Sequence, residues 1–174
     1  MRRIVISGAS GGGKSTLLAE LSRRGYGVME EPGRAVVREE TARGGTGLPT
    51  VDLPRFAELA GLRALALHKA AGEGVTFFDR SVVDAVAVFL RLGLPLPEGL
   101  TGALDRVRYD PLVFMTPPWK AIYRTDAERL HGFEAARAEY EHLLALYPEA
   151  GYAVRLLPMV DVAARADFIE AAIR

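Results

Sequence analysis

Residues 4–16 read Ile4-Val5-Ile6-Ser7-Gly8-Ala9-Ser10-Gly11-Gly12-Gly13-Lys14-Ser15-Thr16. From Gly8 onward this stretch matches the pattern G-x-x-x-x-G-K-[ST] at every fixed position. The β-branched apolar run before it predicts a buried strand, and the leucines of residues 17–24 after it predict a helix. A glycine-rich turn between a strand and a helix is the context in which this pattern binds phosphate, so we expect a phosphate-binding loop here.

The chemistry of phosphate binding explains the residue types in this loop. Glycines let the backbone turn through angles that other residues avoid, so successive N–H groups can converge on phosphate oxygens at the positive end of the following helix. Lys14 is expected to reach the β- and γ-phosphates, and the Ser15 hydroxyl to ligate Mg²⁺. A glycine-rich turn that binds nothing would leave both residues unexplained. The predicted nucleotide-binding residues are Gly8, Ser10, Gly11, Gly12, Gly13, Lys14, Ser15 and Thr16.

Length and charge narrow the classes of protein to consider. The 174 residues predict one domain spanning 1–174, and Lys+Arg and Asp+Glu are both 22, so the net charge is zero. Neither nucleic acid nor an anionic membrane is an expected partner, because the chain is not basic overall and has no polybasic cluster. The apolar run after Met1 is too short for a signal peptide, and no segment is long enough to span a bilayer.

Three residue types are absent from the chain: cysteine, asparagine and glutamine. The lack of cysteine excludes disulfides and thiolate chemistry and fits a cytoplasmic location. The joint depletion of thermolabile residues resembles thermophile proteins, with genome composition as the alternative explanation. Without asparagine or glutamine, the chain can carry neither the N-K-x-D guanine motif of GTPases nor the H-R-D-x-x-x-x-N loop of protein kinases.

Two predicted strands end in acidic residues. The second strand, residues 26–30, is stopped by a proline and places Glu31 at the carboxyl edge of the sheet, where ligands of parallel sheets bind. We therefore interpret Glu31 as catalytic or substrate-binding. The alternative is a polar strand end or an acidic residue that favours the start of a helix over residues 33–43.

Residues 75–79 predict a third, buried strand that delivers Asp79 to Mg²⁺. Arg80 follows it with a planar fork of donors for a phosphate or a substrate hydroxyl. The alternative is a surface salt bridge between Asp79 and Arg80. Ser81 and Asp84 have the spacing of a capping box and predict a helix through Leu92.

The remaining elements are predicted from local patterns. The glycine-rich residues 44–50 are expected to form a flexible loop near the site, followed by a helix that Asp52 caps. We interpret His68 on that helix as a packed or half-exposed residue and not as a metal ligand, because no second ligand stands three or four residues away. Further elements are a helix over 98–108, a strand over 111–116, a helix from 133, a strand over 153–158 and a last helix capped by Asp161.

The segment from Trp119 to Gly132 is dense in charged and aromatic side chains and has no apolar stripe. It lies within residues 117–135, between the fourth strand and the next helix. We interpret this segment as a small lid whose arginines, Arg124 and Arg129, approach the transferring phosphoryl group. The alternative is a solvated, charged connection. Together the five strands alternating with helices predict an α/β fold: a parallel sheet, joined by right-handed crossovers, with helices on both faces.

These motifs resemble the nucleoside and nucleotide kinase branch of P-loop proteins. Their order is similar to deoxynucleoside kinases, thymidylate kinases and the bacterial nicotinamide riboside kinase domain. Residues 31–34, the lid and residues 151–158 resemble most closely a family of small P-loop proteins filed under the AAA ATPases. The resemblance spans nearly the whole chain and implies a three-layer fold with a five-stranded sheet in the order 2-3-1-4-5.

The resemblance also implies roles for the site residues. Glu31 would accept the proton of the attacking hydroxyl, Asp79 would help to hold Mg²⁺, and Arg80 would contact the substrate. Arg124 or Arg129 would steady the phosphates, and the segment from Pro158 to Arg165 would pack on adenine. In the alternative assignment, Asp79 is the base and Glu31 orients the substrate.

The sequence therefore predicts a phosphotransferase that uses ATP and Mg²⁺ and acts on a small metabolite such as a nucleoside, nucleotide or riboside. The alternative function is a nucleotide-switched ATPase with a regulatory protein partner. The identity of the acceptor, the choice between ATP and GTP, and the oligomeric state, with a homodimer among the options, stay open.

Overall fold

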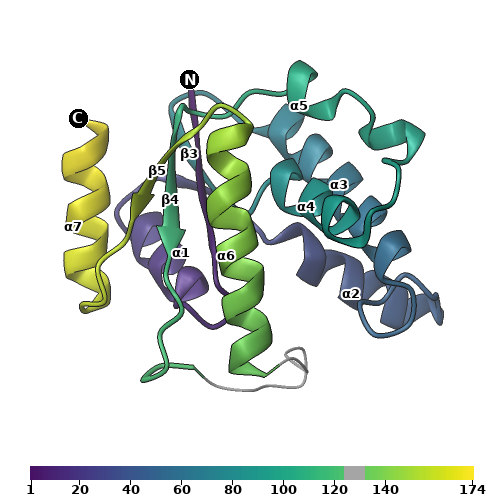
Figure 1. Ribbon diagram of the computed structural model, residues 1–174. Coiled ribbons are helices and arrows are strands. Elements are labelled where there is room, and N and C mark those ends of the chain that lie inside the picture. Colours follow the sequence, from purple (N-terminus) through teal and green to yellow (C-terminus); the bar gives the residue numbers. More distant parts are fainter. Residues whose placement is uncertain (124–131) are drawn as a thin grey trace.

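In the computed structural model, which describes residues 1–123 and 132–174, a parallel sheet forms the centre of the molecule (Figure 1). Its order is β2-β3-β1-β4-β5, and every recorded pairing of neighbouring strands is parallel. The strands are β1 (Arg2–Gly8), β2 (Gly27–Met29), β3 (Val75–Asp79), β4 (Leu112–Thr116) and β5 (Ala153–Leu156). This arrangement confirms the predicted fold class and strand order.

Helices cover both faces of the sheet, which confirms the three-layer architecture. They are α1 (Lys14–Arg23), α2 (Pro32–Arg43), α3 (Leu53–Ala70), α4 (Val82–Leu92), α5 (Ala103–Arg106), α6 (Phe133–Glu149) and α7 (Val162–Ile173), with a 3₁₀ turn over Glu98–Leu100. In Figure 1, α1 and α7 lie on one side of the sheet, and α3, α4 and α6 on the other.

The alternation of side chains along β1 divides the core between the two faces. Ile4 and Ile6 belong to the cluster that contains the leucines of α1 and Ile169 of α7. Val5, between them, belongs to the cluster formed with α3, α4 and α6. Because successive residues of a strand point to opposite faces, three consecutive apolar residues bury both sides of the central strand.

The predicted helix over residues 98–108 is wrong. The structure has a 3₁₀ turn at Glu98–Leu100 and a short α5, separated by an extended Thr101 and by Gly102 with φ 65°. Leu100 and Ala103 are buried on either side of this break. The break lets the turn insert Leu100 against Gly61 of α3, so tertiary packing overrides local helix propensity here.

Several smaller predictions can be checked against the hydrogen bonds. The capping box of Ser81 and Asp84 is present, and Asp52 and Asp161 cap α3 and α7. The strand expected over 26–30 is shorter, at Gly27–Met29, and α1 begins at Lys14, earlier than expected. The connector after α2 is tied to that helix, because the Gly47 N–H donates to the buried Glu40 carboxylate at 2.8 Å.

His68 is packed, as predicted. Its ring stands edge-on to Tyr109 with centroids 4.8 Å apart, and its Nε2 lies 2.9 Å from the Arg108 carbonyl oxygen. No group of three or more histidine and acidic side chains in residues 1–123 and 132–174 could hold a metal. No helix within these ranges has the length and apolar character needed to cross a membrane.

Candidate functional site

The glycine-rich loop after β1 has the backbone conformation that its sequence predicts. Gly8, Gly11 and Gly13 have φ values of 114°, 77° and 79°, a region that side chains with a Cβ rarely adopt. A Cβ on Gly8 would lie 2.4 Å from the carbonyl oxygen of Thr116 on β4. The loop therefore needs glycine both for its turn and for its close approach to the neighbouring strand.

Lys14 begins α1 with its side chain folded back over the loop. Only 7% of the residue is exposed, and Nζ donates to the carbonyl oxygens of Ala9 at 2.8 Å and Gly8 at 3.4 Å. Burial, and after it the charge of Arg80, lowers the pKa of Lys14, while Asp79 and Glu31 act in the opposite direction. The ammonium group is thus held at the loop by carbonyl dipoles and nearby carboxylates.

Asp79 ends β3 beside the central strand, in register with Ile6. It is 4% exposed, and burial raises its pKa to about 6, with the negative charge of Glu31 adding to the shift and that of Lys14 opposing it. Its Oδ1 is buried and has no hydrogen-bond partner in the described part of the chain. A buried carboxylate oxygen without a partner is suited to a cation or a donated proton.

Arg80 has the left-handed backbone conformation, with φ 67°, the one non-glycine residue described to do so. Its N–H still continues the sheet by donating to the Ile6 carbonyl oxygen at 3.0 Å. The side chain makes ion pairs with Glu139 at 2.8 Å, Asp84 at 3.1 Å and Glu31 at 3.6 Å. A conformation that costs about 1–2 kcal/mol is thus maintained by three carboxylates around one guanidinium group.

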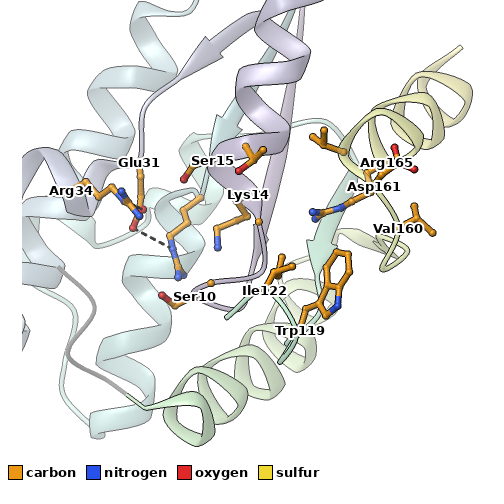
Figure 2. A pocket seen from close by; sticks show the side chains of 15 residues that line it. Ser10, Lys14, Ser15, Glu31, Arg34, Trp119, Ile122, Val160, Asp161 and Arg165 are labelled. Atoms are coloured by element: carbon orange, nitrogen blue, oxygen red, sulfur yellow. Dashed lines mark hydrogen bonds and ion pairs between the residues drawn. The ribbon is translucent and has the colours of Figure 1, made fainter. Parts of the chain in front are cut away.

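Glu31 stands immediately before α2, at the carboxyl end of β2. Its carboxylate lies 3.0 Å from Nε of Arg34 and 3.6 Å from Nε of Arg80, and 22% of its side chain is exposed (Figure 2). Pro32 at the first helical position fixes where this helix starts. The proline that ended the predicted strand therefore also sets the position of the carboxylate.

Asp84 has a larger role in the site than its prediction as a helix cap suggests. It accepts hydrogen bonds from the Ser7 hydroxyl at 2.5 Å and from the Tyr147 hydroxyl at 2.6 Å, besides the N–H of Ser81. Burial, and then the charge of Asp84, raises the pKa of Tyr147. The capping pattern was visible in the sequence, but these partners come from β1 and α6, so only the fold brings them together.

Two cavities open at this edge of the sheet. The larger, of about 600 Å³, extends from Glu31 across the phosphate loop to α7 (Figure 2). Its lining residues are Ser10, Gly11, Gly13, Lys14, Ser15, Thr16, Glu31, Arg34, Arg80, Trp119, Ile122, Val160, Asp161, Val162 and Arg165. The end far from Glu31 is the more apolar, with Trp119, Ile122 and Val160.

The smaller cavity, of about 130 Å³, lies against α3 and α4. Its apolar wall consists of Phe56, Ala57, Ala60, Ala85 and Val88, and its polar wall of Glu31, Arg80, Ser81, Asp84 and Glu139. Glu31 and Arg80 line both cavities. The two cavities therefore adjoin at an ion pair, one beside the phosphate loop and one with an apolar wall.

The structure brings most of the predicted site residues together. Glu31, Arg80 and the predicted loop residues other than Gly8 and Gly12 line the larger cavity, and Asp79 is buried close enough to shift the pKa of Lys14. Pro158 is not part of the lining, whereas residues 160–162 after it are. Arg124 and Arg129 lie outside the described residues. Trp119 and Arg165 were expected near the nucleotide only as ends of longer segments, the lid and the segment that would pack on adenine. Neither was singled out as a site residue, because each carried only a local signal: an aromatic in a charged segment, and an arginine within an apolar helical pattern.

Comparisons with known proteins agree with this arrangement. A family model described as AAA domain (AAA_28) matches residues 3–165. Deoxyadenosine kinase from M. mycoides with bound dATP has a TM-score of 0.68 at 18% identity, with 99% of each chain covered. The NadR protein in complex with NR has a TM-score of 0.65 at 20% identity and covers 99% of this chain, which corresponds to 50% of the NadR chain. A search of curated proteins gave no match.

Proposed function

The chain belongs to the AAA domain family AAA_28, and from this premise we propose that it is a phosphotransferase that uses ATP and Mg²⁺ to phosphorylate a small metabolite. The observation that carries the proposal is the shared wall of Glu31 and Arg80 between the phosphate-loop cavity and the smaller cavity. A kinase needs its phosphoryl donor and its acceptor in contact at one point, close to a carboxylate and a cation.

The larger cavity suits a nucleoside triphosphate. The phosphate loop offers backbone N–H groups and Lys14, and its glycines adopt the φ values that let the loop turn. At the other end, Trp119, Ile122 and Val160 offer an apolar surface for a base. The position of a nucleotide along this cavity follows from the two ends: phosphates at the loop and base toward α7.

The donor set also suits magnesium. Ser15 lines the cavity, and Asp79 carries a buried oxygen without a partner in the described chain. Magnesium in such enzymes is held by few protein ligands together with substrate phosphates, so one hydroxyl and one carboxylate are enough from the protein. When bound, the ion would neutralise charge on the transferring phosphoryl group.

The acceptor would enter the smaller cavity with its hydroxyl toward Glu31. A hydroxyl at the shared wall could donate its hydrogen bond to Glu31 and accept one from Arg80. Asp79 is the alternative base, because a carboxylate with a pKa of about 6 holds a proton more readily near neutral pH. In both assignments the protein contributes mainly position and charge, which is most of what phosphoryl transfer requires.

The burial of the carboxylates favours a kinase over a nucleotide-switched regulator. In a switch protein we would expect Glu31 and Asp79 to face solvent or a protein contact, but Asp79 is 4% exposed and the Glu31 side chain 22%. Nucleosides and ribosides are the first acceptors to test, because similar folds occur in deoxyadenosine kinase and in NadR with NR. The chain has no glutamine or asparagine, so any base would have to be recognised without a side-chain amide.

The test is acceptor-dependent ADP release. Purified protein with Mg²⁺ and ATP is assayed against a panel of nucleosides, nucleotides and ribosides, and ATP binding is measured in parallel by calorimetry. We expect one class of acceptor to raise turnover well above the rate with water alone. Intact ATP binding with no stimulation by any acceptor would count against a kinase and leave an ATPase.

A further inference from the structure

Arg165 lies on the first turn of α7 and reaches back to the phosphate loop. Its backbone N–H donates to the carbonyl oxygen of Asp161 at 3.1 Å, and its side chain lines the larger cavity (Figure 2). Only 3% of the residue is exposed. Arg165 and Gly13, although far apart in sequence, thus belong to the wall of one cavity, and Arg165 is buried there.

The guanidinium group touches the loop directly. One terminal nitrogen donates to the Gly12 carbonyl oxygen at 3.1 Å, and the other would lie 2.7 Å from a Cβ on Gly13. The group also stands over the Trp119 ring, 5.9 Å from its centroid. Its Nε is buried and has no hydrogen-bond partner among the residues that the structure describes. Arg165 thus has unused donor capacity beside the loop.

Arg165 has no carboxylate partner in residues 1–123 and 132–174, in contrast with Arg80. Asp161, which lines the same cavity, accepts a hydrogen bond from the Ala164 N–H and caps the helix instead. Burial lowers the pKa of Arg165, and no acidic residue within the described ranges acts against it. A buried cation without an anion is costly, so the site is incomplete until a negative group enters the cavity.

We propose that Arg165 is a second phosphate-binding cation, supplied by α7, which pairs with the polyphosphate of the bound nucleotide. The inference rests on the proposed nucleotide binding and adds a residue that the phosphate-loop motif does not include. A guanidinium group can donate two parallel hydrogen bonds to a phosphate. Lys14 lies near the charges of Asp79 and Glu31, whereas the Arg165 side chain is bonded to the neutral Gly12 carbonyl oxygen and meets no carboxylate in the described part of the chain.

Two ligands separate phosphate binding from stacking on a base. Calorimetry of the wild-type protein, Arg165→Met and Arg165→Lys is performed with Mg–ATP and with Mg–tripolyphosphate, which has no base. We expect Arg165→Met to lose affinity for both ligands by roughly 10- to 100-fold, and Arg165→Lys to lose less. Arg155→Met is the matched control, because Arg155 is exposed on β5, and it should bind both ligands like the wild type.

Thermal unfolding without ligand distinguishes ligand binding by Arg165 from a merely structural role of its side chain. Because removal of an unpaired buried charge relieves a cost, the melting temperature of ligand-free Arg165→Met should equal or exceed that of the wild type. A lower melting temperature, a loss confined to ATP, or unchanged affinity for both ligands would each overturn the inference. If the wild-type protein itself binds neither ligand, the proposed nucleotide binding fails instead, so the two failures are distinguishable.

Discussion

Nε of Arg80 lies 3.6 Å from Oε1 of Glu31, on the wall that the two cavities share. The pair joins two segments distant in sequence, the end of β3 and the residue before α2. Any molecule that fills either cavity meets both a cation and a carboxylate at this wall. If this wall is the reaction centre, substitutions of the side chains around it should change activity or ligand binding.

Glu31→Gln tests the carboxylate at this wall. The change keeps the size of the side chain and removes its ability to accept a proton, so we expect kcat to fall by roughly 10²- to 10⁴-fold while nucleotide affinity is largely kept. Steady-state kinetics with the best acceptor measure the effect. Glu30→Gln is the control, because Glu30 is a half-exposed neighbour paired with Arg38. A normal kcat in Glu31→Gln would show that Glu31 is not the base and would favour Asp79 instead.

Lys14→Met tests the phosphate loop. The variant loses the cation that is held at the loop carbonyl oxygens, so we expect turnover to fall by roughly 10²- to 10³-fold. Nucleotide binding should weaken at the same time, as measured by calorimetry. Lys69→Met changes an exposed lysine on α3 and should have no effect. Equal activity of the two variants would contradict a phosphate-binding role for Lys14.

Asp79→Asn tests the pH dependence of stability. Burial raises the folded-state pKa of Asp79 to about 6 from its usual 3.8, so the folded state binds a proton more readily than the unfolded state. Asp79 therefore costs stability above pH 6, and this cost disappears as the pH falls below about 4. The asparagine variant without ligand should exceed the wild type at pH 7.5 by on the order of 3 kcal/mol.

The measurement for Asp79→Asn is urea unfolding of both proteins between pH 4 and about 8. The difference in free energy of unfolding should shrink steadily toward low pH. In the same variant, stabilisation by nucleotide should lose its dependence on magnesium. A stability difference that does not change with pH would show that burial does not raise the pKa of Asp79.

Arg80→Ala and Arg80→Gly separate the side chain of Arg80 from its backbone. Both variants remove the cation that pairs with Glu139 and Asp84, while Glu31 keeps its ion pair with Arg34, and both should lose roughly 3–5 kcal/mol. The glycine variant should be more stable than the alanine variant by about 1 kcal/mol, because glycine tolerates φ 67° without strain. Urea unfolding gives both differences. The reverse order would mean that the left-handed conformation is absent in solution.

Tyr147→Phe tests the support of Asp84. The tyrosine donates to Asp84 at 2.6 Å from a fully buried position, so its loss should cost about 1–3 kcal/mol. Tyr140→Phe is the matched control on the same helix, since the Tyr140 hydroxyl makes no hydrogen bond within the described residues, and it should be nearly neutral. Nucleotide affinity should stay unchanged in both variants, because neither side chain lines the larger cavity.

The sequence predicted those features that depend on neighbouring residues. The phosphate loop, the strand ends at Glu31 and Asp79, and the cap at Ser81 are local patterns, and all are present in the structure. Contacts that join distant segments were not predictable: Arg165 was expected only as the end of a segment that packs on adenine, and the fold brings its side chain to Gly12. The helix expected over residues 98–108 was wrong because buried Leu100 required a turn that Gly102 permits.

Some predictions stay predictions. Arg124 and Arg129 lie outside the described residues, so their contact with phosphates is untested, as is the lid that contains them. Single-domain organisation over 1–174, a cytoplasmic location and a thermophilic origin likewise stay predictions from the sequence. The family membership and the fold, in contrast, confirm the resemblance to nucleoside-kinase-like P-loop proteins.

The most direct test of the central claim follows the γ-phosphoryl group itself. The protein is incubated with Mg²⁺, γ-labelled ATP and the acceptor panel, and the products are separated by mass. A kinase predicts the label on one class of small acceptor, with that product lost in Glu31→Gln. Label found in inorganic phosphate alone, whatever acceptor is present, would contradict phosphoryl transfer and identify the protein as an ATPase.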